Sequence, residues 1–169
     1  MPAFRQPPPN MLAYGHGYSL NTILLRPKST GSVIIKSANP SEAPIIDLNM
    51  LDATEDLEAL LGAIKTSREI LSSSEFSHLK PTEFRPGPEV QTDEDWKEYI
   101  RANAQTVYHP VGTCKMGVGE DAVVDSNLRV IGLRNLRVID ASIMPRIVGG
   151  NTTAPTIMIA EKGADIIKK

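Results

Sequence analysis

The chain has 169 residues, which is enough for one ordinary domain with a hydrophobic core. Basic and acidic residues nearly balance, 18 against 20, and the net charge of −2 argues against nucleic acid as a partner. The single cysteine excludes an internal disulfide and a multi-thiolate metal site. No apolar run approaches the roughly 20 residues of a membrane helix, and no apolar signal region occurs, so the sequence predicts neither a membrane segment nor a location.

The first part of the sequence predicts an extended arm, two strands and a long helix. Residues 1–18 include three consecutive prolines, which fix φ and favour an extended arm. The runs 19–27 and 31–37 are rich in β-favouring residues, and we interpret them as strands. Across 52–73, apolar residues recur every three or four positions, which indicates a helix with one buried stripe. The stripe consists of Leu57, Leu60, Leu61, Ile64 and Leu71.

Two further helices are predicted, with short β runs between them. The second helix spans 92–104, and the runs 128–132 and 136–141 indicate two short strands joined by a brief turn. A turn then leads into the last helix, where Pro155 suits the first turn because its missing N–H has no intrahelical partner there. The candidate helix caps are Asp52 or Thr54, Thr92 or Asp93, and Thr152 or Thr153. Side chains expected to face a core are Trp96, Tyr99 and Ile100 on the second helix, and Ile157, Ala160, Ala164 and Ile167 on the last.

His109 is the first residue with a candidate chemical role. It precedes Pro110 and a glycine turn, a context in which a side chain can project into a cleft, although a structural imidazole is the more frequent case. A nucleophilic pair of His109 with Cys114 is disfavoured. The members of catalytic Cys/His pairs are brought together by the tertiary fold, and a separation of five residues along a turning strand gives no reason for the two side chains to touch. A zinc site would need more ligands than one cysteine and three scattered histidines supply. We therefore expect Cys114 to be a small, buried apolar residue.

Two polar residues further along the chain are candidate ligand contacts. Asp140 ends an apolar run before Ala141 and Ser142, where a carboxylate can accept hydrogen bonds from ligand hydroxyls or cap the next turn. Asn151 follows two glycines and precedes the last helix, whose N-terminus offers unpaired N–H groups and a positive dipole end. The residues alone leave open whether this is a ligand site or a glycine-rich loop with an ordinary cap.

Four segments agree in order and spacing with one known family. They are LLRPKSTGSVIIKSANPSEAPIIDLNML, YHPVGTCKMG, AVVDSNLRVIGLRNLRVIDASIMP and GGNTTAPTIMIAEKGADII. Together they resemble the C-terminal region of the glucose–methanol–choline oxidoreductases, most closely the animal glucose-dehydrogenase-like branch, from about residue 19 to the end. The resemblance implies an FAD-dependent enzyme that oxidises an alcohol or sugar CH–OH group and passes electrons to oxygen or a quinone-like acceptor.

The resemblance also implies roles for individual residues. His109 matches the family's active-site histidine, which would act as base, because an unperturbed imidazole accepts a proton near neutral pH. Asn151 matches the second active-site position, which is His or Asn in different members, and would orient the substrate oxygen. The implied flavin contacts are Asp140, Ala141, Asn151, Thr152 and Thr153.

One departure from the family concerns the motif G-x-G-x-x-G, which holds the ADP half of FAD. It does not occur in this sequence, since GHGYSL at 15–20 has only two of the glycines. We therefore expect the C-terminal part of a longer enzyme, inactive by itself; the alternative is a truncated, catalytically inactive interaction module. The expected fold class is α+β, with the arm at 1–18. Residues 19–105 would supply substrate-domain sheet and helices, and residues 106–169 the returning strands and last helix of the FAD domain.

Overall fold

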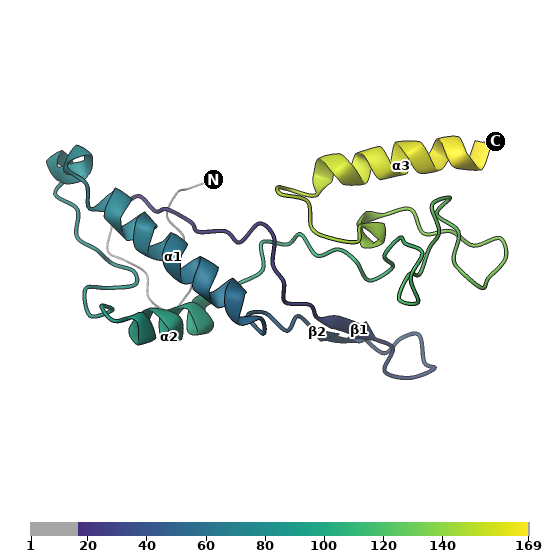
Figure 1. Ribbon diagram of the computed structural model, residues 1–169, viewed down its shortest axis with the longest axis horizontal. Coiled ribbons are helices and arrows are strands. Elements are labelled where there is room, and N and C mark those ends of the chain that lie inside the picture. The colour runs from purple at the N-terminus through teal and green to yellow at the C-terminus, as the bar shows by residue number, and fades with distance from the viewer. Residues whose placement is uncertain (1–16, 169) are drawn as a thin grey trace.

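The structure, a computed structural model, describes residues 17–168, so all of the expected arm except residues 17 and 18 lies outside the described residues. It combines a small antiparallel sheet with helices, which confirms the expected α+β class (Figure 1). The elements are β1 (Ser32–Ile34), β2 (Ile45–Asp47), α1 (Thr54–Leu71), the 3-10 turn η1 (Ser74–Leu79), α2 (Asp93–Asn103), the 3-10 turn η2 (Ala141–Ile143) and α3 (Thr153–Lys168).

The sheet consists of β1 and β2, paired antiparallel with Val33 opposite Ile46. The predicted strand at 19–27 is wrong, and within the run 31–37 only Ser32–Ile34 forms a strand. Leu20, Ile23 and Leu25 in the first run remain about half exposed, so no sheet neighbour covers them among the described residues. Strand propensity is realised only where a second strand supplies hydrogen bonds and packing, which explains the difference.

Helix α1 confirms the long helix expected from the apolar stripe, but a distant residue caps it. Its N-cap residue is Ala53, with no capping side chain of its own, so neither predicted cap acts. Instead, the Ala53 backbone N–H donates to the Ser29 hydroxyl at 3.0 Å. The segment before β1 therefore supplies a hydrogen-bond acceptor to a backbone N–H at the start of the helix, a long-range contact that sequence spacing cannot reveal.

The carboxylate of Asp56 holds that segment in place. Asp56 is buried in the first turn of α1 and accepts hydrogen bonds from the Lys28 N–H, the Ser29 N–H and the Ser29 hydroxyl, at 2.5–3.1 Å. Burial alone would raise the pKa of Asp56, but these bonds and the Lys28 charge outweigh it and hold the pKa below its ordinary value.

Helices α1 and α2 enclose one of two apolar clusters. As predicted, α2 buries Trp96 and Ile100, and they pack on Leu57 and Leu61 of α1. The Arg68 guanidinium lies 4.1 Å from the centre of the Trp96 ring, a cation–π contact that covers the cluster. The predicted cap is also present, because Thr92 forms a reciprocal capping box with Asp95.

The second apolar cluster lies beneath α3, at the other end of the molecule (Figure 1). Its buried members are Val124, Leu128, Ile143, Met144 and Ile159. The predicted strands at 128–132 and 136–141 are wrong, because these runs pair only through isolated bridges, Arg129 with Arg137 and Val124 with Val130. Within the described residues no further strand pairs with these two runs. They therefore pack against the cluster as irregular segments.

The buried face of α3 differs from the one predicted. Ile159 and Gly163 face the cluster, whereas Ile157 and Ile167 are 58% and 60% exposed. A Cβ placed on Gly163 would lie 2.3 Å from the Cγ2 of Ile139, so the close approach requires glycine. The apolar residues of α3 are compatible with two buried faces, and the structure buries the one with Ile159 and Gly163.

Candidate active site

Three segments meet at the start of α3: residues 109–116, the turn η2 and the helix N-terminus. The backbone N–H groups of Gly112 and Cys114 both donate to the Ser142 carbonyl, at 3.1 Å each, and that of Met116 donates to the Ile143 carbonyl at 2.8 Å. Gly112 has a φ of 92°, a left-handed conformation that favours glycine. These bonds fix the chain that follows His109 onto η2.

The His109 side chain connects this segment to α3. Its Nδ1 lies 2.9 Å from the Oγ1 of Thr152, and the imidazole is partly buried. Thr152 is only 8% exposed, and its carbonyl accepts the Thr156 N–H at 3.0 Å, which makes it the N-cap of α3. The Nε2 of His109 makes no hydrogen bond with the described residues, so it is available to a ligand.

Asn151 directly precedes the threonine that holds His109. Its carboxamide is exposed and makes no hydrogen bond with the described residues. Thr153, the first residue of α3, is also exposed. The structure thus bonds the predicted imidazole to Thr152, the chain neighbour of Asn151.

Asp140 and Ala141 form the start of the turn η2 at this meeting point. One Asp140 carboxylate oxygen, Oδ1, accepts the Ser142 N–H at 2.8 Å, so the side chain caps η2 as the sequence allowed. Ala141 packs at the edge of the cluster beneath α3. The Oδ2 of Asp140 makes no hydrogen bond with the described residues, and Asp140 is exposed.

Residues 27–160 match the family described as GMC oxidoreductase, in its C-terminal part. The chain belongs to this family. It is 47% identical over 167 residues to an alcohol dehydrogenase (acceptor) of Pseudomonas putida, which covers 99% of this chain and 30% of that protein. It is 45% identical over 153 residues to the mitochondrial choline dehydrogenase of Mus musculus, covering 89% of this chain and 26% of that protein.

Solved structures support the same family. Pyridoxine 4-oxidase from Mesorbium loti superposes with a TM-score of 0.78 at 38% identity, covering 83% of this chain and 28% of that one. The Aspergillus oryzae formate oxidase gives a TM-score of 0.80 at 32% identity, covering 86% and 26%. The chain spans at most 30% of the length of these relatives. The expected family is therefore confirmed, and the narrower glucose-dehydrogenase-like branch stays a prediction.

A glycine run that sequence reasoning missed lies outside the site of this GMC oxidoreductase chain. Residues 117–122, GVGEDA, fit the G-x-G-x-x-A form of the dinucleotide-binding motif. The structure makes them a turn between the bridged residues Met116 and Val124, held by an ion pair from Lys115 to Asp121. Because no helix begins directly after the run, it lacks the helix N-terminus that binds a pyrophosphate.

The Cys114 thiol makes no hydrogen bond with the described residues, so no base is placed to activate it. Cys114 is partly rather than fully buried, so the expectation of a buried residue is only approximate, and its backbone N–H is committed to η2. In the described part of the chain, no group of three His, Cys, Asp or Glu side chains is placed to hold a metal ion. No helix within residues 17–168 is long and apolar enough to cross a membrane.

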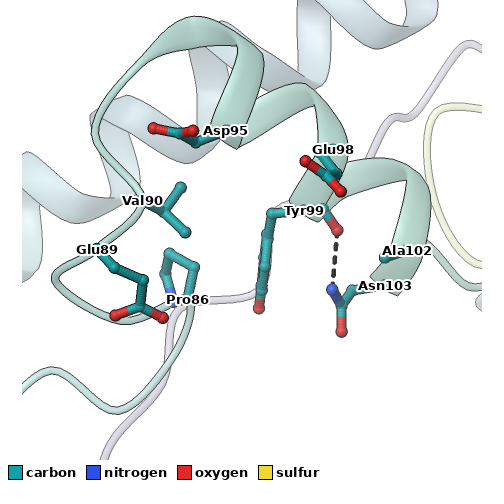
Figure 2. A pocket seen from close by; sticks show the side chains of 8 residues that line it. All are labelled: Pro86, Glu89, Val90, Asp95, Glu98, Tyr99, Ala102 and Asn103. Atoms are coloured by element: carbon teal, nitrogen blue, oxygen red, sulfur yellow. Dashed lines mark hydrogen bonds between the residues drawn. The ribbon is translucent and has the colours of Figure 1, made fainter.

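A hollow of about 310 Å³ lies along α2 rather than at His109 (Figure 2). It lies beside the Tyr99 ring, and burial raises the pKa of this phenol above its ordinary value. Its lining residues are Pro86, Glu89, Val90, Asp95, Glu98, Tyr99, Ala102 and Asn103. The hollow includes none of the predicted site residues.

Proposed function

We propose that this chain supplies the catalytic pair of an FAD-dependent oxidoreductase that oxidises an alcohol or sugar CH–OH group. The observation that carries the proposal is the hydrogen bond between His109 and Thr152, the residue next to Asn151. The relatives support the reaction class, because two of them are named for alcohol and choline oxidation. FAD is supported by a Chaetomium thermophilum structure named as an FAD-dependent oxidoreductase, with a TM-score of 0.79 at 32% identity.

We propose that backbone and side-chain groups around the start of α3 contact the flavin. The first N–H groups of a helix have no intrahelical acceptor, so those of Thr153 and Ala154 are available to the carbonyl edge of a flavin ring. The positive end of the helix would stabilise negative charge there. The free oxygen of Asp140 suits a flavin-chain hydroxyl, and Ala141 beside it presents no bulk. FAD, when bound, accepts a hydride from the alcohol carbon.

His109 and Asn151 would act on the alcohol oxygen. The Nε2 of His109 accepts the hydroxyl proton, which allows negative charge to build on that oxygen as the C–H bond breaks. The Asn151 amide donates a hydrogen bond to the same oxygen and fixes the carbon in position. Oxygen or a quinone-like compound is the proposed electron acceptor, since the relatives include both an oxidase and a dehydrogenase named for an acceptor.

We also propose that residues 1–169 do not retain FAD by themselves. The motif G-x-G-x-x-G, which holds the ADP half of FAD, does not occur in the sequence. The related run at 117–122 is not followed directly by a helix. The division at residue 105 into substrate-domain and FAD-domain portions belongs to the same proposal. A visible spectrum of the purified 169-residue chain tests it: no flavin absorbance is expected, and a stoichiometric flavin spectrum contradicts it.

Turnover of the natural protein at its full length, purified with its flavin, tests the catalytic proposal. His109→Gln should retain the flavin spectrum and lose alcohol oxidation by about 10²-fold or more, the usual contribution of a general base. His78→Gln is the matched control, because His78 is exposed and, among the described residues, its Nδ1 hydrogen-bonds only to the Glu75 carbonyl of its own turn. Equal turnover in the two variants would remove His109 from the reaction.

A further inference from the structure

The hydroxyl of Thr152 has an unusual position for a helix cap. A Thr at the N-cap normally accepts the backbone N–H of the third helical residue, which satisfies one orphan donor. Helix α2 shows this arrangement, because the Thr92 hydroxyl accepts the Asp95 N–H at 3.2 Å. In α3 the third residue after Thr152 is Pro155, which has no N–H to donate.

The proline therefore frees a buried hydroxyl oxygen, and the structure directs it to His109. Thr152 Oγ1 lies 2.9 Å from the imidazole Nδ1, and Thr152 is 8% exposed. Thr152 is itself fixed to the helix, since its carbonyl accepts both the N–H and the hydroxyl of Thr156, at 3.0 and 2.6 Å. The imidazole is thus anchored to a rigid helix end through one side-chain contact.

We propose that Thr152 is the positioning residue of this site, rather than a flavin contact, and that it selects the tautomer of His109. The Nδ1–H donates to the lone pairs of Thr152 Oγ1, which no backbone N–H of the first turn occupies. The Nε2 then carries the free lone pair, which can accept the alcohol proton. After that transfer, Thr152 Oγ1 still accepts the Nδ1–H of the imidazolium and stabilises its charge.

This inference rests on the proposed function, and its test separates the two. The natural protein at its full length, labelled with ¹⁵N-histidine, is compared with Thr152→Val and Thr152→Ser, and His109→Gln identifies the His109 signals. Long-range ¹H–¹⁵N correlation reports which imidazole nitrogen carries the proton. Thr66→Val is the matched control, because among the described residues the Thr66 hydroxyl bonds only to its own helix, at the Gly62 carbonyl.

We expect His109 to carry its proton on Nδ1 in the natural protein, in Thr152→Ser and in Thr66→Val. Thr152→Val should shift the proton toward Nε2 and lower kcat by about 10- to 100-fold, as loss of a hydrogen bond to a charged group predicts. KM should change little, and Thr152→Ser should restore kcat. Because the Thr152 hydroxyl does not cap the helix, Thr152→Val should keep its helix content.

Two results would overturn the inference: an Nε2–H tautomer in the natural protein, or an unchanged tautomer in Thr152→Val. The tautomer is measured without turnover, so it judges Thr152 even if the protein oxidises no alcohol. A protein that shows the predicted tautomer but neither flavin nor alcohol oxidation would refute the proposed function alone. Full activity in Thr152→Val with a shifted tautomer would refute the positioning role while leaving the oxidoreductase proposal standing.

Discussion

The buried carboxylate of Asp56 provides a sharp test of how the first half of the chain is held together. Asp56→Ala removes the acceptor of three donors, namely the Lys28 N–H, the Ser29 N–H and the Ser29 hydroxyl. Hydrogen bonds to a charged group contribute about 1.5–3 kcal/mol each, but contributions within one network are not additive. We expect a loss of roughly 3–5 kcal/mol in the free energy of unfolding. The Ser29 contact to the Ala53 N–H should weaken with it.

Urea unfolding followed by the fluorescence of Trp96, the only tryptophan of the chain, measures this loss. Trp96 is 2% exposed and packs on Leu57, the residue after Asp56. Asp52→Ala is the matched control, because it removes the same charge near the same helix end, and Asp52 makes no hydrogen bond with the described residues. It should leave the unfolding midpoint nearly unchanged. A loss below about 1 kcal/mol in Asp56→Ala, or equal losses in both variants, would refute the reasoning.

The stability difference between the unchanged chain and Asp56→Ala should depend on pH with a definite sign. Because the folded pKa of Asp56 lies below its ordinary value of 3.8, the stabilisation is fully present above that value. It is lost progressively as the pH falls through the folded pKa, where the carboxylate becomes protonated. The unchanged 169-residue chain and its Asp56→Ala variant should therefore converge in stability only under strongly acidic conditions. Convergence already near neutral pH would show that the ionised carboxylate is not the stabilising form.

Three further substitutions test other parts of the account. Thr92→Ala should destabilise α2 by about 1 kcal/mol through loss of its capping box, measured by urea unfolding; an unchanged midpoint would argue against the cap. Gly163→Ala should cost about 1–3 kcal/mol by overpacking Ile139, although alanine favours helices, and a gain in melting temperature would contradict this contact. Cys114→Ala should leave alcohol turnover unchanged; a large loss would revive the nucleophile alternative.

The sequence predicts best those features that depend on local pattern. Helices α1 and α2 follow from apolar periodicity, and the cap at Thr92 follows from residue type, because both are settled within a few residues. The runs at 19–27 and 128–132 contain the same kind of residues as real strands but lack a strand partner among the described residues. Strand formation is decided by long-range pairing, so composition alone misassigns them.

Long-range contacts also decide which site residues interact. The sequence and the family resemblance single out His109, Asn151 and Thr152, but they place Thr152 against the flavin. The structure bonds the Thr152 hydroxyl to the imidazole, and its flavin contact stays a prediction. A signal was present in the sequence, since Pro155 three residues after a capping threonine leaves that hydroxyl without its usual donor. The Ser29 cap of α1, which comes from 24 residues upstream, left no such signal.

The central claim is that an imidazole and a carboxamide act on one substrate oxygen. The most direct measurement is the rate at which an alcohol reduces the bound flavin without oxygen, in the natural full-length protein and in His109→Gln, Asn151→Ala and the double variant. If both groups act on the same oxygen, the double variant should be far less impaired than the product of the two single effects. Single effects that multiply independently, or an Asn151→Ala rate equal to that of the natural protein, would contradict the claim.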